Sequence, residues 1–423
     1  MAADASTPTR WDHAALGVLL AALALMPFGS ASEAAFAVGA LWGLMLALRG
    51  RVDWRAAQTR LALGLFAAYW LPELLSAVDA RLPQRAWKEA SVDLRYLPFL
   101  LFALRALGSE PLRRRAGLGV AAILALWLVD ALLQAATGLS LGGPAEADRL
   151  SGIFGADDLK LGGVVAILSP FLLWPAFARH RLLGALALLA VVTVTLLAGA
   201  RAAWLALALA LAMTLWQRFG GGRRALAALG LALLASIVLA AAGYALSERF
   251  AERVQRSAAF TEGVDGLDHA LAGRLPIWRT ALRMIDDNPI NGVGVRGFRH
   301  AYADYADGDD PWLGFDGDAG AFHAHQIVLE VASETGAVGL FCWLWAALLA
   351  LRHWRQSAAM ARRAAMPAGI ALAAMLFPLN THYAFYSTAW GGLLFFLLAL
   401  WLAALGSEHG EKSEPGPHGG CAH

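Results

Sequence analysis

Long apolar runs alternate with short polar connections along most of the chain. A helix needs roughly 17–25 apolar residues to cross a bilayer, and about twelve runs approach or meet that criterion. They are centred near Leu20, Leu41, Phe66, Leu100, Leu126, Leu168, Ala190, Leu209, Leu233, Leu344, Leu372 and Leu397. The pattern predicts an all-α polytopic membrane protein with about 12 transmembrane helices. About nine of these helices fall in residues 1–247 and about three in residues 326–405.

Composition supports the same fold class. The chain is 59% hydrophobic and only 16% charged, whereas a soluble protein is about half apolar and a quarter charged. The first run, Ala14 to Met26, resembles a signal-peptide core followed by small residues. Asp4 and Asp12 precede it, however, and another apolar run follows at once. We therefore expect an uncleaved first span.

Basic residues indicate the orientation, because they cluster in alternate connections. These clusters are Arg49, Arg51, Arg55 and Arg60; Arg105, Arg113, Arg114 and Arg115; Arg179 and Arg181; Arg218, Arg223 and Arg224; and Arg352, Arg355, Arg362 and Arg363. Arginine-rich loops stay in the cytoplasm by the positive-inside rule. An even number of spans then places both termini in the cytoplasm, and residues 406–423 form a polar tail that we expect to be disordered.

One connection on the opposite side is much longer than the others. Residues 248–325 form a predicted periplasmic loop, and a loop of this length is usually functional. Arg274 to Asp287 has apolar residues at helical spacing, and Asn288-Pro289 ends the pattern. We expect interfacial helices here, with Trp278 among the lipid headgroups.

Arg201 is an unusual charge, because it lies between two spans on the side where arginine is disfavoured. A guanidinium there is suited to binding phosphate oxygens, although an arginine at a helix end can also snorkel to the membrane surface. Arg274 opens the helix of the long loop and is a second candidate anion ligand. Other arginines of the loop are able to share the role, namely Arg279, Arg283, Arg296 and Arg299.

His325 lies where the long loop meets the next apolar run, and its imidazole can take up a proton near neutral pH. His323 is two residues away, but a metal site needs further ligands that are not evident. The acidic stretch Asp304 to Asp318 does not have the spacing of a calcium loop. We expect no metal, no cofactor and no disulfide between Cys342 and Cys421. His382 belongs either to an aromatic belt or to a sugar site.

Several glycines accompany these residues. Gly292-Val293-Gly294 and Gly297 predict a tight turn that lets backbone approach closely. Gly336 and Gly339 follow His325 on the same apolar run and predict close helix packing.

These motifs resemble a known family. His325-Gln326, a nine-residue gap and Gly336-x-x-Gly339 are similar to the signature of bacterial O-antigen ligases. The stretch from Gly273-Arg274 through Asn288-Pro289 to Phe298 resembles the loop region of that family, and the Arg201 segment resembles its outer-edge arginine. O-antigen polymerases and protein O-oligosaccharyltransferases belong to the same larger family.

The resemblance implies a function. It implies metal-independent, inverting transfer of O-antigen polysaccharide from undecaprenyl diphosphate to a sugar hydroxyl of lipid A–core. This reaction belongs to lipopolysaccharide assembly on the periplasmic side of the bacterial inner membrane. His325 is then the base, Arg201 and Arg274 bind the diphosphate, and no nucleic acid takes part.

Three alternatives stay open. A polymerase or a protein O-oligosaccharyltransferase would use the same residue types. A transporter of polyprenyl-linked sugars would more often carry charges within its spans. Here the charges avoid the span centres, apart from Asp130 and Glu73, which favours an enzyme.

Overall fold

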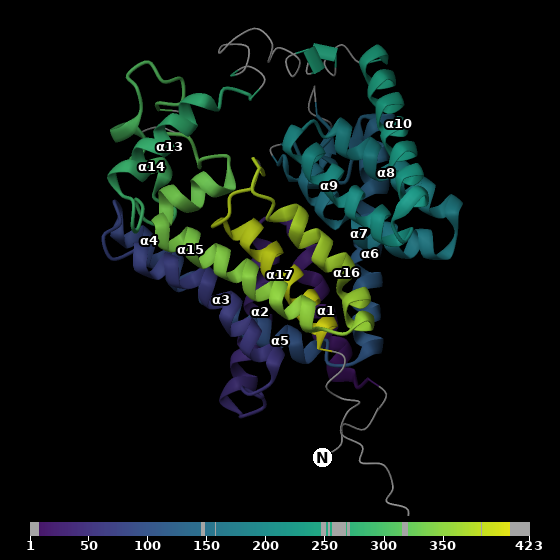
Figure 1. Ribbon diagram of the computed structural model, residues 1–423, viewed down its shortest axis with the longest axis horizontal. Coiled ribbons are helices and arrows are strands. Elements are labelled where there is room, and N and C mark those ends of the chain that lie inside the picture. Colours follow the sequence, from purple (N-terminus) through teal and green to yellow (C-terminus); the bar gives the residue numbers. More distant parts are fainter. Residues whose placement is uncertain are drawn as a thin grey trace, which may run out of the picture.

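The computed structural model describes residues 8–144, 149–156, 158–246, 251–252, 254–255, 268, 271–314, 320–381 and 383–406. Helices dominate these residues, as the apolar pattern predicts (Figure 1). His382 and the predicted tail beyond Gly406 lie outside the described residues. The described chain begins and finishes on one side of the helical bundle, and α13 (Leu275–Asp287) and α14 (Phe298–Tyr305) lie on the opposite side (Figure 1).

The first part of the chain forms six α-helices and a short hairpin. The helices are α1 (Arg10–Ala24), α2 (Ser30–Leu48), α3 (Ala57–Ser76), α4 (Pro83–Asp93), α5 (Tyr96–Ala106) and α6 (Glu110–Thr137). A 3-10 turn, η1 (Met26–Phe28), separates α1 from α2. The hairpin strands β1 (Leu139–Ser140) and β2 (Gly143–Pro144) pair antiparallel, and a second 3-10 turn, η2 (Gly152–Phe154), follows them.

The second part contains the long connection between two groups of helices. The first group is α7 (Lys160–Arg179), α8 (Arg181–Leu197), α9 (Arg201–Arg218) and α10 (Gly222–Leu246). The long connection contributes α13 (Leu275–Asp287) and α14 (Phe298–Tyr305). The chain then forms α15 (Ile327–Gln356), α16 (Ala359–Met375) and α17 (Thr388–Leu405).

Six helices within the described ranges are long and apolar enough to cross a membrane. They are α2, α6, α7, α10, α15 and α17. The other six predicted span centres also fall in helices, namely α1, α3, α5, α8, α9 and α16. The total of about twelve crossings therefore stays a prediction.

The fourth predicted span is a short helix, as the length of its apolar run from Leu94 to Leu104 indicates. Its helix, α5, has 11 residues and so extends only about 16 Å, against a hydrocarbon core of about 30 Å. Asp93 and Arg95 precede it and form a partly buried cluster, in which Arg95 lies 2.9 Å from the carboxylate of Glu33 on α2. The Tyr69 hydroxyl donates to Asp93 at 3.2 Å in the same cluster. These polar contacts replace the apolar residues that would continue the helix.

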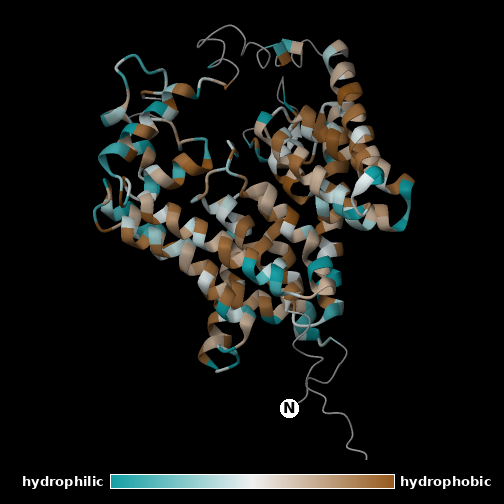
Figure 2. Cartoon of the chain, viewed as in Figure 1, coloured by the Kyte–Doolittle hydropathy of each residue, from teal (hydrophilic) through white to brown (hydrophobic). Residues whose placement is uncertain are grey.

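The core of the bundle forms around α17. This helix is hydrophobic on all sides, and 89% of its residues are buried. Both properties are expected of a helix at the centre of a bundle. Phe395 on α17 stacks on Tyr96 of α5 with ring centroids 4.4 Å apart. Hydrophobic residues fill the bundle, whereas hydrophilic residues gather around α13, α14 and the connections at the other end (Figure 2). The connections on either side of α13 and α14 therefore cover the start of α15 with polar residues, and we call this region the polar layer.

Candidate active site

A break in α15 organises the polar layer. Gly336 has φ 62° and ψ −158° inside this helix, a conformation that L side chains rarely adopt. The Pro289 and Ile290 carbonyls fill the break and accept from the Ala337 and Val338 amides at 2.8 and 3.2 Å. A Cβ on Gly336 would meet the Ile290 oxygen at 2.1 Å. The sequence prediction of helix packing at Gly336 is therefore wrong, because the glycine admits a loop instead.

The glycine-rich turn after α13 approaches the same break, as predicted. A Cβ on Gly292 would lie 2.4 Å from the Glu334 carbonyl carbon. The Val293 and Gly294 amides donate to the Ser333 and Glu334 carbonyls at 2.8 and 3.0 Å. The turn therefore docks on the first part of α15 and brings Arg296 to it.

Arg296 completes this docking through its backbone. It has φ 57°, and its N–H donates to the Glu334 carboxylate at 2.8 Å. Glu334 is only 2% exposed. A buried carboxyl group thus fixes the peptide of Arg296, and its guanidinium is near enough to His323 to lower the pKa of that ring.

His325 ends the long connection directly before α15. Gln326 caps this helix, because its side-chain oxygen accepts from the Leu329 amide at 2.6 Å and its amide donates to the Pro378 carbonyl at 2.8 Å. His325 has φ 50°, which is uncommon for a residue other than glycine. Its N–H donates to Nδ1 of His323 at 3.2 Å, and the two rings lie 3.9 Å apart.

His323 is held as a neutral ring. Burial lowers its pKa to about 3, with further lowering by the Arg296, Arg274 and Arg299 cations. Its Nδ1 lies 3.2 Å from Oε2 of Glu330, which looks like an ion pair by distance alone. Because the ring is neutral, this contact is a hydrogen bond rather than an ion pair, and the His325 N–H bonds to the same ring nitrogen. Glu330 therefore anchors His323, and His323 anchors the peptide of His325.

Arg201 and Arg274 approach each other from distant parts of the chain. Arg201 is the first residue of α9, and Arg274 is the N-cap of α13. Burial, followed by the Arg201 charge, lowers the pKa of Arg274 to about 10, so Arg274 is still a cation at neutral pH. Two guanidinium groups in mutual range repel each other, and a bound anion would relieve that repulsion.

The connection between α16 and α17 contacts both the start of α15 and α7. The Asn380 carbonyl accepts from the Ile327 amide at 3.1 Å, next to His325. The Tyr383 hydroxyl donates to the Gly163 carbonyl of α7 at 3.2 Å. Trp278 of α13 donates its indole N–H to the Ala324 carbonyl at 3.1 Å, so this indole holds α13 to the residues before α15, and its contact with lipid headgroups stays a prediction. His382 is in the same connection but outside the described residues.

Other candidate residues have different surroundings. Arg279 is on the exposed side of α13. Several acids of the Asp304–Asp318 stretch bind separate partners: Asp304 pairs with Arg81, Asp307 with Arg283, and Asp310 accepts from Tyr302. Among the described residues, no group of three or more His, Cys, Asp or Glu side chains is placed to hold a metal ion.

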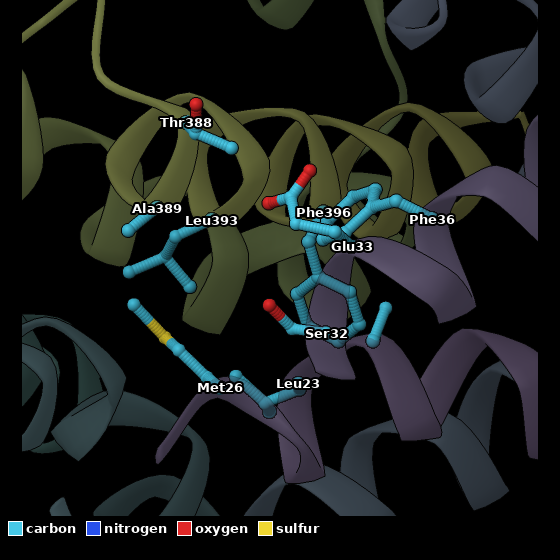
Figure 3. Close-up of a pocket in the computed structure, with 10 residues that line it drawn as sticks. Leu23, Met26, Ser32, Glu33, Phe36, Thr388, Ala389, Leu393 and Phe396 are labelled. Carbon is cyan, nitrogen blue, oxygen red and sulfur yellow. The ribbon is translucent and has the colours of Figure 1, made fainter. Parts of the chain in front are cut away.

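A small cavity lies elsewhere, beside the end of α1 and the starts of α2 and α17. Apolar side chains line most of it, including Met26, Phe36 and Leu393, and Ser32, Glu33 and Thr388 contribute polar atoms (Figure 3). It contains none of the candidate histidines or arginines. We therefore place the candidate active site at the start of α15 rather than in this cavity.

Sequence reasoning did not assign Glu330 and Glu334 to the site. Both are acids within an apolar run, 1% and 2% exposed respectively, and charge in such a run is itself a signal of function or pairing. Their partners come from the long loop, so their roles depend on a fold that spacing alone does not reveal.

One family model matches the middle of the chain. Residues 185–344 match a family model described as O-antigen ligase. The matched segment includes Arg201, Arg274, Arg279, Arg296, His323 and His325, whereas His382 lies beyond it. No curated protein matches the chain. The match runs from α8 to α15, and this part of the chain is similar to O-antigen ligases.

Proposed function

We propose that the protein transfers O-antigen polysaccharide from undecaprenyl diphosphate to a sugar hydroxyl of lipid A–core. The reaction takes place on the periplasmic side of the inner membrane. The observation that carries the proposal is that Arg201 and Arg274 are close enough for the charge of one to lower the pKa of the other. Arg274 is also close enough to His323 to lower the pKa of that ring. His323 in turn contacts His325. One region thus combines cations for a diphosphate with an imidazole that can act as a base.

The two arginines act on the leaving group. As the bond between the anomeric carbon and the diphosphate oxygen breaks, negative charge grows on that oxygen. Guanidinium groups already fixed near it stabilise this charge without reorganising. The undecaprenyl diphosphate leaves as an anion bound to Arg201 and Arg274.

His325 acts on the acceptor. Its imidazole takes the proton of the sugar hydroxyl as the acceptor oxygen bonds to the anomeric carbon. Attack opposite the leaving diphosphate involves no covalent enzyme intermediate, so the anomeric configuration inverts. The neutral His323 neither repels the protonated His325 nor competes for its proton, and it fixes the position of the His325 peptide.

A deletion strain tests the biological role. We expect loss of long-chain lipopolysaccharide and accumulation of O-antigen polymer on the lipid carrier. Lipopolysaccharide that carries a single repeat unit would instead indicate a polymerase. Unchanged lipopolysaccharide with loss of protein glycosylation would indicate a protein O-oligosaccharyltransferase.

Arginine variants test the site in the purified protein. We expect Arg201→Ala and Arg274→Ala each to lower kcat/KM for a lipid-linked donor by about 10²-fold or more. Lysine at either position should recover only part of the activity, because it lacks the planar fork of donors. Arg279→Ala is the matched control, since Arg279 is on the exposed side of the same helix as Arg274. Full activity of both alanine variants would refute the diphosphate assignment.

A further inference from the structure

A large aromatic side chain is held at the surface directly before the two histidines. Phe322 is 41% exposed, whereas its neighbours Ala321 and His323 are 1% and 9% exposed. A single exposed apolar residue is common in proteins, so exposure alone indicates no site. Phe322 differs from such residues because the backbone around it is docked on helices and a cation lies over its ring.

The backbone on both sides of Phe322 is docked on neighbouring helices. The Gly320 amide donates to the Arg299 carbonyl of α14 at 2.9 Å. The Ala324 carbonyl accepts from the indole N–H of Trp278 on α13 at 3.1 Å. These bonds lie two residues before and two residues after Phe322. The ring is therefore presented by a segment that is fixed before any substrate binds.

Arg299 links this ring to the candidate active site. Its guanidinium carbon lies 4.4 Å from the centroid of the Phe322 ring, which is the range of a cation–π contact. Burial lowers the pKa of His323, and Arg299 is among the cations that lower it further. The guanidinium is thus within electrostatic range of His323, whose ring centroid lies 3.9 Å from that of His325. The pair of Phe322 and Arg299 therefore borders the proposed base.

An aromatic ring beside a guanidinium group suits both kinds of surface that a sugar presents. The C–H groups on one face of a pyranose pack on the electron-rich face of an aromatic ring. The sugar hydroxyls accept hydrogen bonds, and a guanidinium carries several N–H donors. Inserting Phe322 among acyl chains would instead carry the Arg299 cation into the bilayer at high cost. The charge over the ring therefore favours a hydrated saccharide over membrane lipid.

We propose that Phe322 and Arg299 form a saccharide subsite that binds the acceptor sugar beside His325. The inference rests on the proposed function. The acceptor is favoured over the donor glycan because His325 takes the proton of the acceptor hydroxyl, whereas Arg201 and Arg274 hold the donor at its diphosphate. Packing on the ring limits the orientations of the acceptor sugar, so one hydroxyl is presented to the base.

Substitutions at Phe322 test the subsite by kinetics. We expect Phe322→Leu, which keeps an apolar side chain but has no aromatic face, to raise KM for the lipid A–core acceptor about five- to tenfold. Its KM for the lipid-linked donor should stay unchanged, and Phe322→Trp should restore the acceptor KM. Leu282→Ala is the control, because Leu282 is 56% exposed on α13 of the same long connection and should leave both KM values unchanged.

Two kinetic outcomes would overturn the proposal. Wild-type KM values in Phe322→Leu would show that the aromatic face binds no substrate. A raised KM for the donor with an unchanged KM for the acceptor would assign the ring to the donor glycan instead. A raised acceptor KM in Phe322→Trp as well as in Phe322→Leu would show that the side chain acts through packing rather than by stacking on a sugar.

Binding of a free oligosaccharide tests the subsite without catalysis. The probe is the core oligosaccharide released from lipid A, which carries no acyl chains. In saturation-transfer titrations with the purified protein, Phe322→Leu and Arg299→Ala should each weaken its binding about fivefold or more. Absence of binding to the wild type, or equal binding to Phe322→Leu, would overturn the proposal. Binding that depends on Phe322 in a protein that transfers no glycan would leave the subsite standing and refute the proposed function alone.

Discussion

Positive backbone φ angles mark the residues that carry the site. Among the described residues other than glycine, only Ala272, Arg296 and His325 have φ above zero. Such conformations cost energy and persist where surrounding contacts impose them. At His325 the N–H bond to His323 supplies one such contact, and at Arg296 the bond to Glu334 does so. The protein therefore fixes the backbone of these two residues before any substrate binds.

The backbone conformation at His325 guides the choice of variant. We expect His325→Asn to lower kcat by about 10²–10⁴-fold, the usual contribution of a general base. Asparagine tolerates positive φ, so the turn before α15 should persist. Transfer assays on the purified variant measure the loss, and an unchanged unfolding midpoint shows that the fold is intact. Full activity of His325→Asn would refute the base assignment.

The neutral state of His323 predicts a pH dependence of stability. Its pKa is about 3 in the folded protein against an ordinary 6.5, so the unfolded chain binds the extra proton in the window between these values. Stability from this group is present above about pH 6.5 and is lost as the pH falls, by about 1.4 kcal/mol per pH unit. We expect His323→Asn to remove this loss while its side-chain oxygen still accepts the His325 N–H.

Unfolding in detergent between pH 4.5 and pH 7 measures this difference. Parallel pH profiles for wild type and His323→Asn would contradict the buried neutral ring. His323→Phe, which has no acceptor atom, should in addition lower kcat because the His325 peptide loses its partner.

The sequence indicates a candidate site residue where a charge lies on the side of the membrane that disfavours it. Arg201 is such a residue by the positive-inside rule, and Arg274 is a candidate because it opens an amphipathic helix. Spacing could not separate Arg274 from Arg279, since both belong to one helical pattern and only packing exposes the second. Glu330 and Glu334 were missed because their partners are brought together by the loop after α13.

At the scale of elements, α15 is two helices joined by a break. The first part carries Glu330 and Glu334 and anchors the long loop, and the second part continues into the bundle. The loop carbonyls that enter the break satisfy amides that helix geometry leaves without partners. Helix and loop are thus mutually dependent, and the site is built at their junction.

Gly336→Ala tests this dependence. A Cβ would meet the Ile290 oxygen at 2.1 Å and would force a residue with a side chain to φ 62°. We expect a loss of stability of about 3 kcal/mol or more, together with loss of transfer. Gly230→Ala on α10 is the matched control, because a Cβ there has nothing within 4 Å and alanine favours helices by up to about 1 kcal/mol. Similar unfolding midpoints for the two variants would contradict the description of the break.

Helices with long apolar runs could be predicted from the sequence, whereas breaks within and between them could not. Every predicted span centre lies in a helix, and the end of α13 at Asn288 was indicated by the following proline. The break at Gly336 was not, because a glycine in an apolar run fits helix packing equally well. The division between α4 and α5 also escaped prediction, since Arg95 pairs with Glu33 of α2, which is distant in the sequence.

At the scale of the whole molecule, the candidate site lies away from the ends of the described chain. The described chain begins and finishes at one end of the bundle, and α13, α14 and the start of α15 lie at the other (Figure 1). If the arginine-rich connections face the cytoplasm, the candidate site faces the periplasm. Lipid-linked donors and lipid A–core would then both reach it from the outer leaflet.

Cysteine labelling tests this orientation. In a chain with Cys342 and Cys421 replaced by serine, we would compare Asp309→Cys, on the long connection, with Asp53→Cys, on the connection before α3. Both aspartates are exposed, so reactivity with a membrane-impermeant maleimide depends on the side of the membrane. We expect Asp309→Cys to react in intact spheroplasts and Asp53→Cys to react only after lysis. The reverse pattern would place His325 and Arg201 in the cytoplasm, where a periplasmic transfer reaction is impossible.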